Sequence, residues 1–313
     1  MAGADSIDSI DQSTPGRDLA RLVRAEDRAR IDQLTQDPPA ATLIICHGPG
    51  AHAGARTLAD ALTVHGDHPV ALSPADERWR LPELRSELAA SLSHHPQRRH
   101  IVHLQEANTI NAAGFDQLLL TVEDPPSAAW IIIDVHDLRA LPATVRGRAG
   151  QQLAFGVSSR DVRADYLEHL GVSLSAADAL LDATPHSSSF EMLLADASDP
   201  AALAASLATL TSLTLTSAAP ATRAFELTSA TLEAAAMLPS KQRARAARRI
   251  TATMCQVAEG RVNAAVRARD DRATFARAAV TLAALPRAAQ LLAANAPISA
   301  VYLALCAPPD ERA

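Results

Sequence analysis

The segment HIVHLQEANTINAAGFDQLLLTVEDPPSAAWIIIDVHDLRALPATVRGRAG (100–150) decides the fold of this chain. Its two apolar runs, 99–104 and 128–134, do not alternate between apolar and polar residues, as expected of strands buried on both faces of a sheet. The helical pattern between them, at 111–123, places four apolar side chains on one face: Phe115, Leu118, Leu119 and Val122. This strand, helix, strand order predicts a parallel sheet with helices on both faces.

The same alternation continues on both sides of this segment. Further apolar runs lie at 41–46, 68–73 and 151–155, with helical patterns at 55–64 and 82–94. Alternating strands and helices are typical of one α/β layer structure around a parallel sheet. We therefore expect an α/β domain at 16–157, preceded by a flexible polar tail at 1–15.

Helical patterns alone follow residue 157. Three short helices are expected first, each opened by a serine followed three positions later by an acidic residue, at Ser158, Ser175 and Ser188. They predict a helical lid domain at 158–196, in which Gly171 ends the first helix. Longer patterns predict a C-terminal helical domain at 197–313, with helices near 200–213, 220–237, 240–269 and 272–294 and a short one after Pro297. The expected fold class is α/β plus all-α.

Composition and charge exclude several classes of protein. The 313 residues contain 29 Lys and Arg against 35 Asp and Glu, so the net charge of −6 excludes a globally basic nucleic-acid binder. Three scattered cysteines, Cys46, Cys255 and Cys306, exclude a disulfide framework and a cysteine-rich zinc site. With an acidic, polar start and no long apolar run, a cytoplasmic protein without membrane contact is expected.

The turn after the first strand has some features of a phosphate-binding loop. In LIICHGPGAHAGARTLADAL (43–62), Gly48 and Gly54 surround the turn and Thr57 follows, but Arg56 stands nearest to the position of the usual lysine. The only lysine of the chain, Lys241, is far away in the sequence. The segment is either a degenerate nucleotide loop or a plain glycine-rich turn between a strand and a helix.

A second candidate motif ends the run IVHLQEAN (101–108). Nucleotide hydrolases place an Asp that orders magnesium and a Glu that polarises water at such a strand end. Here Gln105 takes the Asp position and Glu106 takes the Glu position. An amide is a poor substitute for the metal-ordering carboxylate, and Glu106 alone is equally compatible with a solvated residue at a strand end.

Together, these segments resemble the clamp-loader branch of the AAA+ ATPases, and most closely the delta-prime type of DNA polymerase III subunit. The similarity rests on Glu106-Ala107, on Glu-Asp-Pro-Pro at 123–126 and on LPATVRGR at 141–148, in the family's order and near its spacing. A second match, ALPRAAQLLAANAPISAVYLALCA (284–307), is similar to the end of the family's collar. The resemblance covers about 17–307 and is strongest over 99–155.

The resemblance implies an AAA+ (RecA-like) sheet, a three-helix lid and a helical collar that oligomerises. It implies assembly with gamma/tau and delta subunits, and contact with the sliding clamp and primer-template DNA through the complex. Arg148 matches the arginine finger that the family supplies in trans to a neighbour's ATP, with Arg146 as the fallback if the segment is extended. The alternative is an ordinary surface arginine in an arginine-rich chain.

Departures from the family pattern point away from ATP binding by this subunit. The lid arginine is replaced at Ser188, and the first sensor position falls at Asp134 or Val135, where an acid would repel a triphosphate. We therefore expect no bound ATP or magnesium and no intrinsic ATPase activity. Two alternatives stay open: a weak ATPase in which Arg56 replaces the lysine, and a diverged paralogue that acts as an interaction scaffold.

Two further patterns bear on metals and DNA. The interval 58–100 holds no cysteine, and its histidines (His65, His68, His94, His95 and His100) do not repeat at ligand spacing, so no zinc or other metal site is expected. The stretch 238–272 concentrates basic residues: Lys241, Arg243, Arg245, Arg248, Arg249, Arg261, Arg267 and Arg269. Such a strip follows DNA phosphates, binds an acidic partner or forms a solvated helix face.

Overall fold

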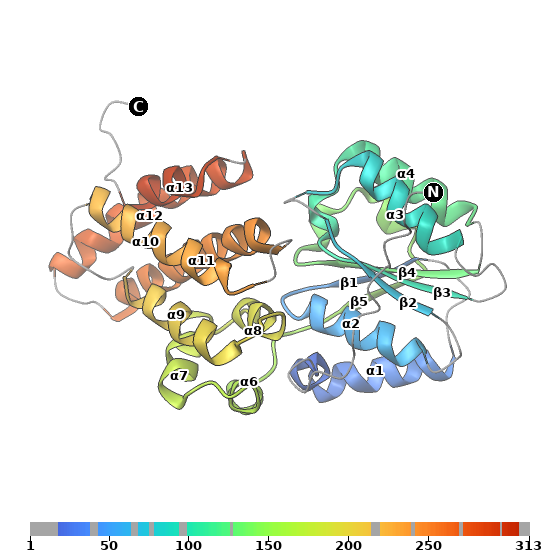
Figure 1. Ribbon diagram of the computed structural model, residues 1–313, viewed down its shortest axis with the longest axis horizontal. Helices are drawn as coiled ribbons and strands as arrows, with labels where there is room; N and C mark the ends of the chain where they lie inside the picture. The colour runs from blue at the N-terminus through green and yellow to red at the C-terminus, as the bar shows by residue number, and fades with distance from the viewer. Residues whose placement is uncertain are drawn as a thin grey trace, which may run out of the picture.

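The computed structural model describes residues 18–37, 43–63, 68–74, 78–93, 99–125, 128–213, 220–238, 242–268, 272–294 and 296–306. The expected tail at 1–15 and Lys241 lie outside these ranges. The chain folds into an α/β half and a helical half, which lie side by side in Figure 1. The predicted fold class, a parallel α/β sheet followed by helices alone, is confirmed.

The five predicted strands form one parallel sheet in the order β2-β3-β4-β1-β5. The strands are β1 (Leu43–His47), β2 (His68–Leu72), β3 (His100–Leu104), β4 (Ala129–Val135) and β5 (Gln151–Ala154). Register pairs Leu43 with Ile131 and Ile101 with Trp130, so β4 lies between the first and third strands. All carboxyl ends therefore meet at one edge of the sheet, which we call the carboxyl edge.

Helices cover both faces of this sheet (Figure 1). One face carries α1 (Ala25–Gln36) and α2 (Ala51–Leu62), with the short helix η1 (Leu19–Leu22); the other carries α3 (Leu81–Ser93), α4 (Ala112–Glu123) and α5 (Ala143–Arg148). Alternate residues of each strand enter different cores: Ile44 and Ile132 join the α2 side, and Leu43 and Ile131 join the α4 side. Burial on both faces explains why the strand sequences lack polar alternation.

The helical half begins with α6 (Arg160–His169), α7 (Leu174–Ala183) and α8 (Ser189–Ala195). Two of the predicted capping serines are wrong, because Ser159 and Ser173 cap α6 and α7 in place of Ser158 and Ser175. Ser158 instead donates a hydrogen bond to the Leu22 carbonyl. The predicted end of α6 is confirmed, since Gly171 has a φ of 78° and its N–H donates to the Glu168 carbonyl.

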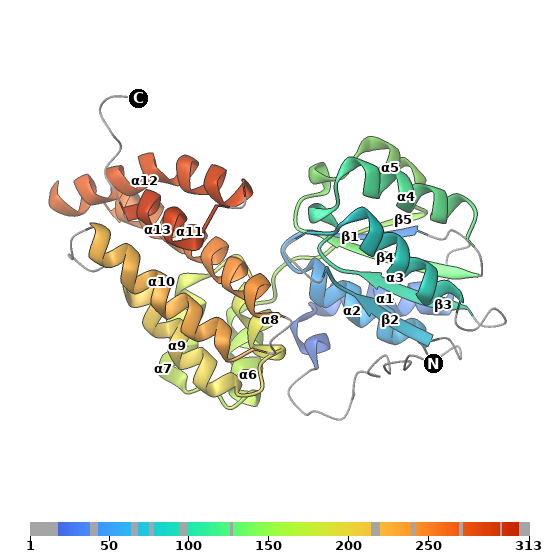
Figure 2. The same cartoon turned by 45° about the horizontal axis from the view of Figure 1, so that its top comes forward.

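The C-terminal helices follow the predicted pattern closely. They are α9 (Pro200–Leu213), α10 (Pro220–Ala236), α11 (Arg243–Ala268), α12 (Arg272–Ala293) and α13 (Ile298–Cys306). Figure 2 shows α11 and α8 turned toward the α/β half. One cluster of buried apolar side chains extends from the α2 face of the sheet through α6–α8 into α9–α13. Among the described helices, none is both long and apolar enough to span a membrane.

Candidate functional site

The turn after β1 is closed by hydrogen bonds within the chain. The Gly48 N–H lies 3.1 Å from the Val135 carbonyl oxygen, and the Gly50 N–H lies 3.1 Å from the Phe155 carbonyl oxygen. Gly48 has a φ of 99°, and a Cβ there would lie 2.5 Å from the Phe155 oxygen. Glycine at these two positions therefore lets the turn pack closely against Phe155 and Gly156, directly after β5. The N–H groups of Gly48 and Gly50 already have acceptors within the chain.

The helix after this turn begins earlier than the sequence predicts. α2 starts at Ala51 rather than Ala55, because an alanine-rich stretch favours helix directly after Gly50. Gly54 and Arg56 are consequently helical residues, and a Cβ at Gly54 would lie 2.3 Å from the Phe155 ring. Thr57 donates its hydroxyl to the Ala53 carbonyl at 2.8 Å. The predicted nucleotide loop is thus a short turn followed by a tightly packed helix.

Glu106 does not point into solvent, as one sequence interpretation allowed. It is the one non-glycine residue with positive φ in the described part of the chain, at 56°. Its carboxylate forms ion pairs with Arg249 and, at 3.1 Å, with Arg245, both on α11. Gln105 lies beside it, and its side-chain oxygen accepts from Arg245 at 3.4 Å. The end of β3 is therefore bound to the helical half.

Several arginines of the basic strip on α11 are occupied by contacts within the chain. Arg245 is buried, 9% exposed, and burial lowers its pKa despite the attraction of Glu106. Arg248 donates to the carbonyls of Leu292 and Ala296, at 3.2 and 3.1 Å, near the end of α12. Arg261 donates to the Thr211 carbonyl in the last turn of α9. Arg245, Arg248 and Arg261 of the predicted strip thus bind a carboxylate or backbone carbonyls of the same chain.

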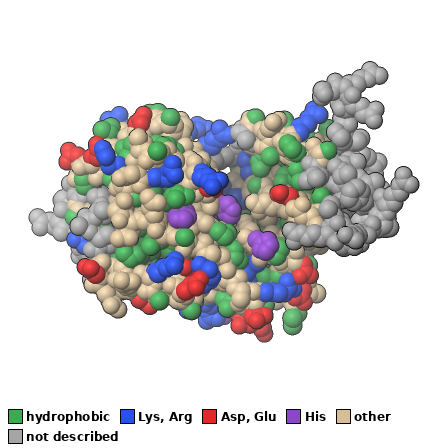
Figure 3. Space-filling model, turned by 180° about the vertical axis from the view of Figure 1, so that it is seen from behind, with side chains coloured by type: hydrophobic (Ala, Val, Ile, Leu, Met, Phe, Trp, Pro, Cys, Tyr) green, Lys and Arg blue, Asp and Glu red, His purple; other side chains and the backbone are tan. Residues whose placement is uncertain are grey.

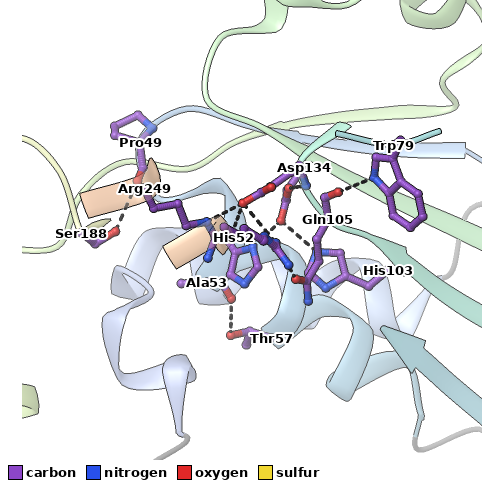
Figure 4. Close-up of polar contacts among 12 residues, drawn as sticks. Pro49, His52, Ala53, Thr57, Trp79, His103, Gln105, Asp134, Ser188 and Arg249 are labelled. Atoms are coloured by element: carbon purple, nitrogen blue, oxygen red, sulfur yellow. Dashed lines mark hydrogen bonds and ion pairs between the residues drawn. The ribbon is translucent and has the colours of Figure 1, made fainter. Parts of the chain in front are cut away.

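Asp134 sits at the centre of a buried polar network, shown in Figure 4. Its Oδ2 accepts from His52 Nδ1 at 2.6 Å and from His103 Nε2 at 3.0 Å. Its Oδ1 accepts from the Glu106 N–H at 2.7 Å. Burial alone would raise the pKa of Asp134, but its interactions with His52 and His103 outweigh burial and hold that pKa well below the usual value. Sequence reasoning found Asp134 but missed both histidines.

The lid contacts the turn through Ser188, at the start of α8. Its hydroxyl donates to the Pro49 carbonyl at 3.3 Å, so Ser188 binds the turn directly. The predicted capping partner of Ser188, Glu191, instead forms a buried ion pair with Arg163. Arg163 also donates to the Thr184 and Ser187 carbonyls at 2.9 and 2.7 Å. This pair fixes the loop that carries Ser188.

Arg148 lies at the edge of the sheet opposite to the carboxyl edge, where the strands begin, and we call this the amino edge. It ends α5, and the following Gly150 N–H donates to the Leu43 carbonyl at the start of β1, at 2.9 Å. Its side chain is 59% exposed and pairs with Glu123, which is 48% exposed, at 2.7 Å. Arg146 is not on the same face, as an extended segment would place it, because the segment is helical. Arg146 is partly buried, and its Nε has no partner among the described residues.

A cavity of about 300 Å³ opens where the turn, the lid and α11 meet. Its polar lining comes from His52, Glu106, Asp134, Ser188 and Arg249, which belong to both halves of the chain. In Figure 3, arginine and histidine side chains gather around the hollow between the two halves. The predicted residues Gly48, Glu106, Asp134 and Ser188 meet at this cavity, whereas Gly54, Arg56, Thr57, Gln105 and Arg148 do not line it.

No protein-family model and no curated protein matches the sequence. Among solved structures, the chain is similar to a DNA polymerase III gamma subunit-related protein from Thermotoga maritima, at 14% identity, with 88% of this chain and 97% of that chain covered and a TM-score of 0.42. It is also similar to the T. maritima RuvB Holliday junction branch migration motor, at 14% identity, 62% and 64% coverage and a TM-score of 0.40. A chain of the E. coli MS115-1 HORMA:CdnC:Trip13 complex shares 18% identity over 54% of this chain and 76% of that chain, at a TM-score of 0.38.

Proposed function

We propose that this chain is a delta-prime-like subunit of a DNA polymerase III clamp loader that does not use ATP itself. It would assemble with gamma/tau and delta subunits and present Arg148 to ATP bound by a neighbour. Through the complex, it would help to load the sliding clamp onto primer-template DNA. The proposal rests on the sequence motifs at 99–155 and 284–307, taken together with the state of the turn after β1.

The part of the proposal in which this chain does not bind ATP is supported by the polar groups around the cavity, which are already paired within the chain. Two N–H groups of the turn, at Gly48 and Gly50, already donate to carbonyls of the chain. Glu106 is paired with two arginines, so it is not free to polarise a water molecule. Asp134, held ionised beside the turn, repels a triphosphate. Losing one well-placed polar contact typically costs about 2.7–4 kcal/mol, and several are lost here together.

The alternative of a weak ATPase built on Arg56 receives no support from the local geometry. Arg56 is a residue of the second turn of α2, where it interacts electrostatically with Asp60. Calorimetry with ATP and magnesium should therefore show no binding in the micromolar range. Micromolar affinity would contradict the proposed lack of ATP binding, and loss of that affinity in an Arg56→Ala variant would favour the weak ATPase.

Exposure of Arg148 supports a role toward another subunit. A guanidinium that is 59% exposed and held by one exposed carboxylate can exchange that partner for a phosphate at small cost. An arginine finger acts mainly in the transition state, and its loss costs about 10³-fold or more at its own site. A loader with several ATP sites would lose only the site that faces this subunit.

The test uses the full chain in a loader reconstituted with gamma/tau and delta. We expect Arg148→Ala to leave assembly intact while lowering clamp-stimulated ATPase in part and clamp loading more strongly. Arg139→Ala, which removes another exposed arginine from the α/β half, is the matched control. A defect in Arg146→Ala alone would move the finger by two residues. Wild-type rates in all variants would leave only a scaffold role, and failure to assemble would overturn the proposal.

A further inference from the structure

Three side chains from three separate elements converge beneath the cavity. His52 comes from the first turn of α2, His103 from β3 and Asp134 from β4. One nitrogen of each ring and one carboxylate oxygen all lie within 4.8 Å of one another. Both nitrogens are aimed at the same oxygen, Oδ2, and Figure 4 shows the two rings on either side of it.

The two carboxylate oxygens of Asp134 have different hydrogen-bond partners. The second oxygen of Asp134, Oδ1, accepts a single bond from the Glu106 N–H, whereas Oδ2 receives both imidazoles. A cation placed among the three atoms would replace two N–H donors that compete for one oxygen. His103 and Asp134 are 2% and 4% exposed, so their positions are fixed by packing rather than by solvent.

The donor set has the chemistry of a transition-metal site. Two imidazole nitrogens and one carboxylate oxygen are ligands that Zn²⁺ binds, whereas Mg²⁺ prefers oxygen ligands and water. The Glu106 N–H orients the carboxylate from outside, as second-shell groups do.

The surroundings leave room for a further ligand. His52 and Asp134 both line the cavity of about 300 Å³, while His103 lies behind them. Three protein ligands with one side open to a cavity resemble the arrangement of zinc sites that keep a position for water or a small ligand. The positive charge of Arg249 near His52 is offset by its ion pair with Glu106.

We propose that His52, His103 and Asp134 bind one Zn²⁺ ion, with the remaining coordination position facing the cavity. The site differs from the sequence expectation of no metal, which considered only the histidines of 58–100. The three ligands come from positions 51 and 31 residues apart, so no sequence spacing indicates them. The proposal does not depend on the clamp-loader assignment. A bound Zn²⁺ would offset the charge of Asp134, so the absence of ATP binding would then rest on the closed turn and on the pairing of Glu106.

The experiment uses full-length protein freed of metal with a chelator and then titrated with zinc chloride. Calorimetry and elemental analysis after dialysis should give one equivalent of zinc. His103→Gln and Asp134→Asn should each weaken binding by more than about 100-fold, since even outer-shell changes cost about 10–100-fold. His136→Gln is the matched control, because His136 lines the same cavity outside the three-ligand cluster.

A second measurement separates loss of metal from loss of fold. Cobalt(II) added to the metal-free protein should give the visible absorption of a low-coordinate nitrogen and oxygen site, and His52→Gln should abolish it. His52 is more exposed than the other two ligands, with 18% of its side chain accessible, so this variant is expected to stay folded by circular dichroism. No zinc uptake by the wild-type protein, or uptake as strong as wild type in all three ligand variants, would overturn the proposal.

Discussion

Charged groups at the two edges of the sheet differ in how exposed they are and in how many partners they have within the chain. At the carboxyl edge, Glu106 and Asp134 bind partners from α11, α2 and β3, and both lie at least partly buried. At the amino edge, Arg148 stands exposed at the end of α5 with one exposed partner. The edge expected to hold a nucleotide is thus committed to intramolecular contacts, while the edge expected to serve a neighbour stays accessible.

The difference between the edges shows which contacts hold the two halves of the molecule together. Polar groups at the carboxyl edge are paired with other residues of the same chain. Arg245 and Arg249 reach Glu106 from the helical half, and Ser188 reaches the Pro49 carbonyl from the lid. The carboxyl edge therefore connects the two halves of the molecule.

The largest expected effect comes from removing the centre of the carboxyl-edge network. Asp134→Ala should lower the free energy of unfolding by about 3 kcal/mol, because one buried and two partly buried donors lose their acceptor and each stranded donor costs about 1–3 kcal/mol. Urea unfolding followed by circular dichroism measures this. The control, Asp116→Ala on the exposed face of α4, should stay within about 0.5 kcal/mol of wild type. Equal free energies of unfolding for the two variants would mean that the network around Asp134 does not stabilise the fold.

The next effect tests the connection between the halves. Arg245→Ala removes the more buried partner of Glu106 and should cost about 1.5–3 kcal/mol, the range for hydrogen bonds to charged groups. Urea unfolding gives the size, and faster limited proteolysis of the native protein would show that the halves separate more readily. Arg243→Ala, two residues away, loses one hydrogen bond to the Leu238 carbonyl and no ion pair to Glu106, so it should change both measurements less than Arg245→Ala does.

Two glycines, Gly54 near the carboxyl edge and Gly147 near the amino edge, allow the packing at the two edges to be compared. Gly54→Ala should destabilise the protein by about 1–3 kcal/mol, because its Cβ would lie 2.3 Å from the buried Phe155 ring. Gly147→Ala in α5 meets nothing within 4 Å and should stabilise by up to about 1 kcal/mol through helix propensity. Thermal unfolding of the two variants should therefore shift in opposite directions. A Gly54→Ala variant as stable as wild type would mean that the packing of α2 on Phe155 tolerates the methyl group.

The smallest expected effect is at the amino edge. Arg148→Ala should change the free energy of unfolding by less than about 1 kcal/mol, since exposed ion pairs contribute about 0–1 kcal/mol. The same urea unfolding experiment tests this. A larger loss would show that Arg148 holds α5 on α4 and would weaken its assignment as a group held available for a neighbour.

The sequence by itself determined the layers of this protein. Apolar strand runs and helical periodicity predict all five strands and the long C-terminal helices to within a few residues, because periodicity reports local burial directly. Gly171 as a helix end and Asn111 as a helix start were equally readable, since Asn111 accepts the Gly114 N–H at 2.8 Å. Local signals fail where neighbours compete, as when Ser158 binds Leu22 instead of capping α6.

Only the tertiary structure decided how the polar groups are paired. Arg249 reaches Glu106 across 143 residues, and His52 reaches Asp134 across 82, so no local pattern could relate them. The same applies to α2, whose early start brings Gly54 against Phe155 and closes the turn. Burial is encoded in each short stretch of sequence, whereas the partner of a buried charge depends on which distant strands and helices the fold places side by side.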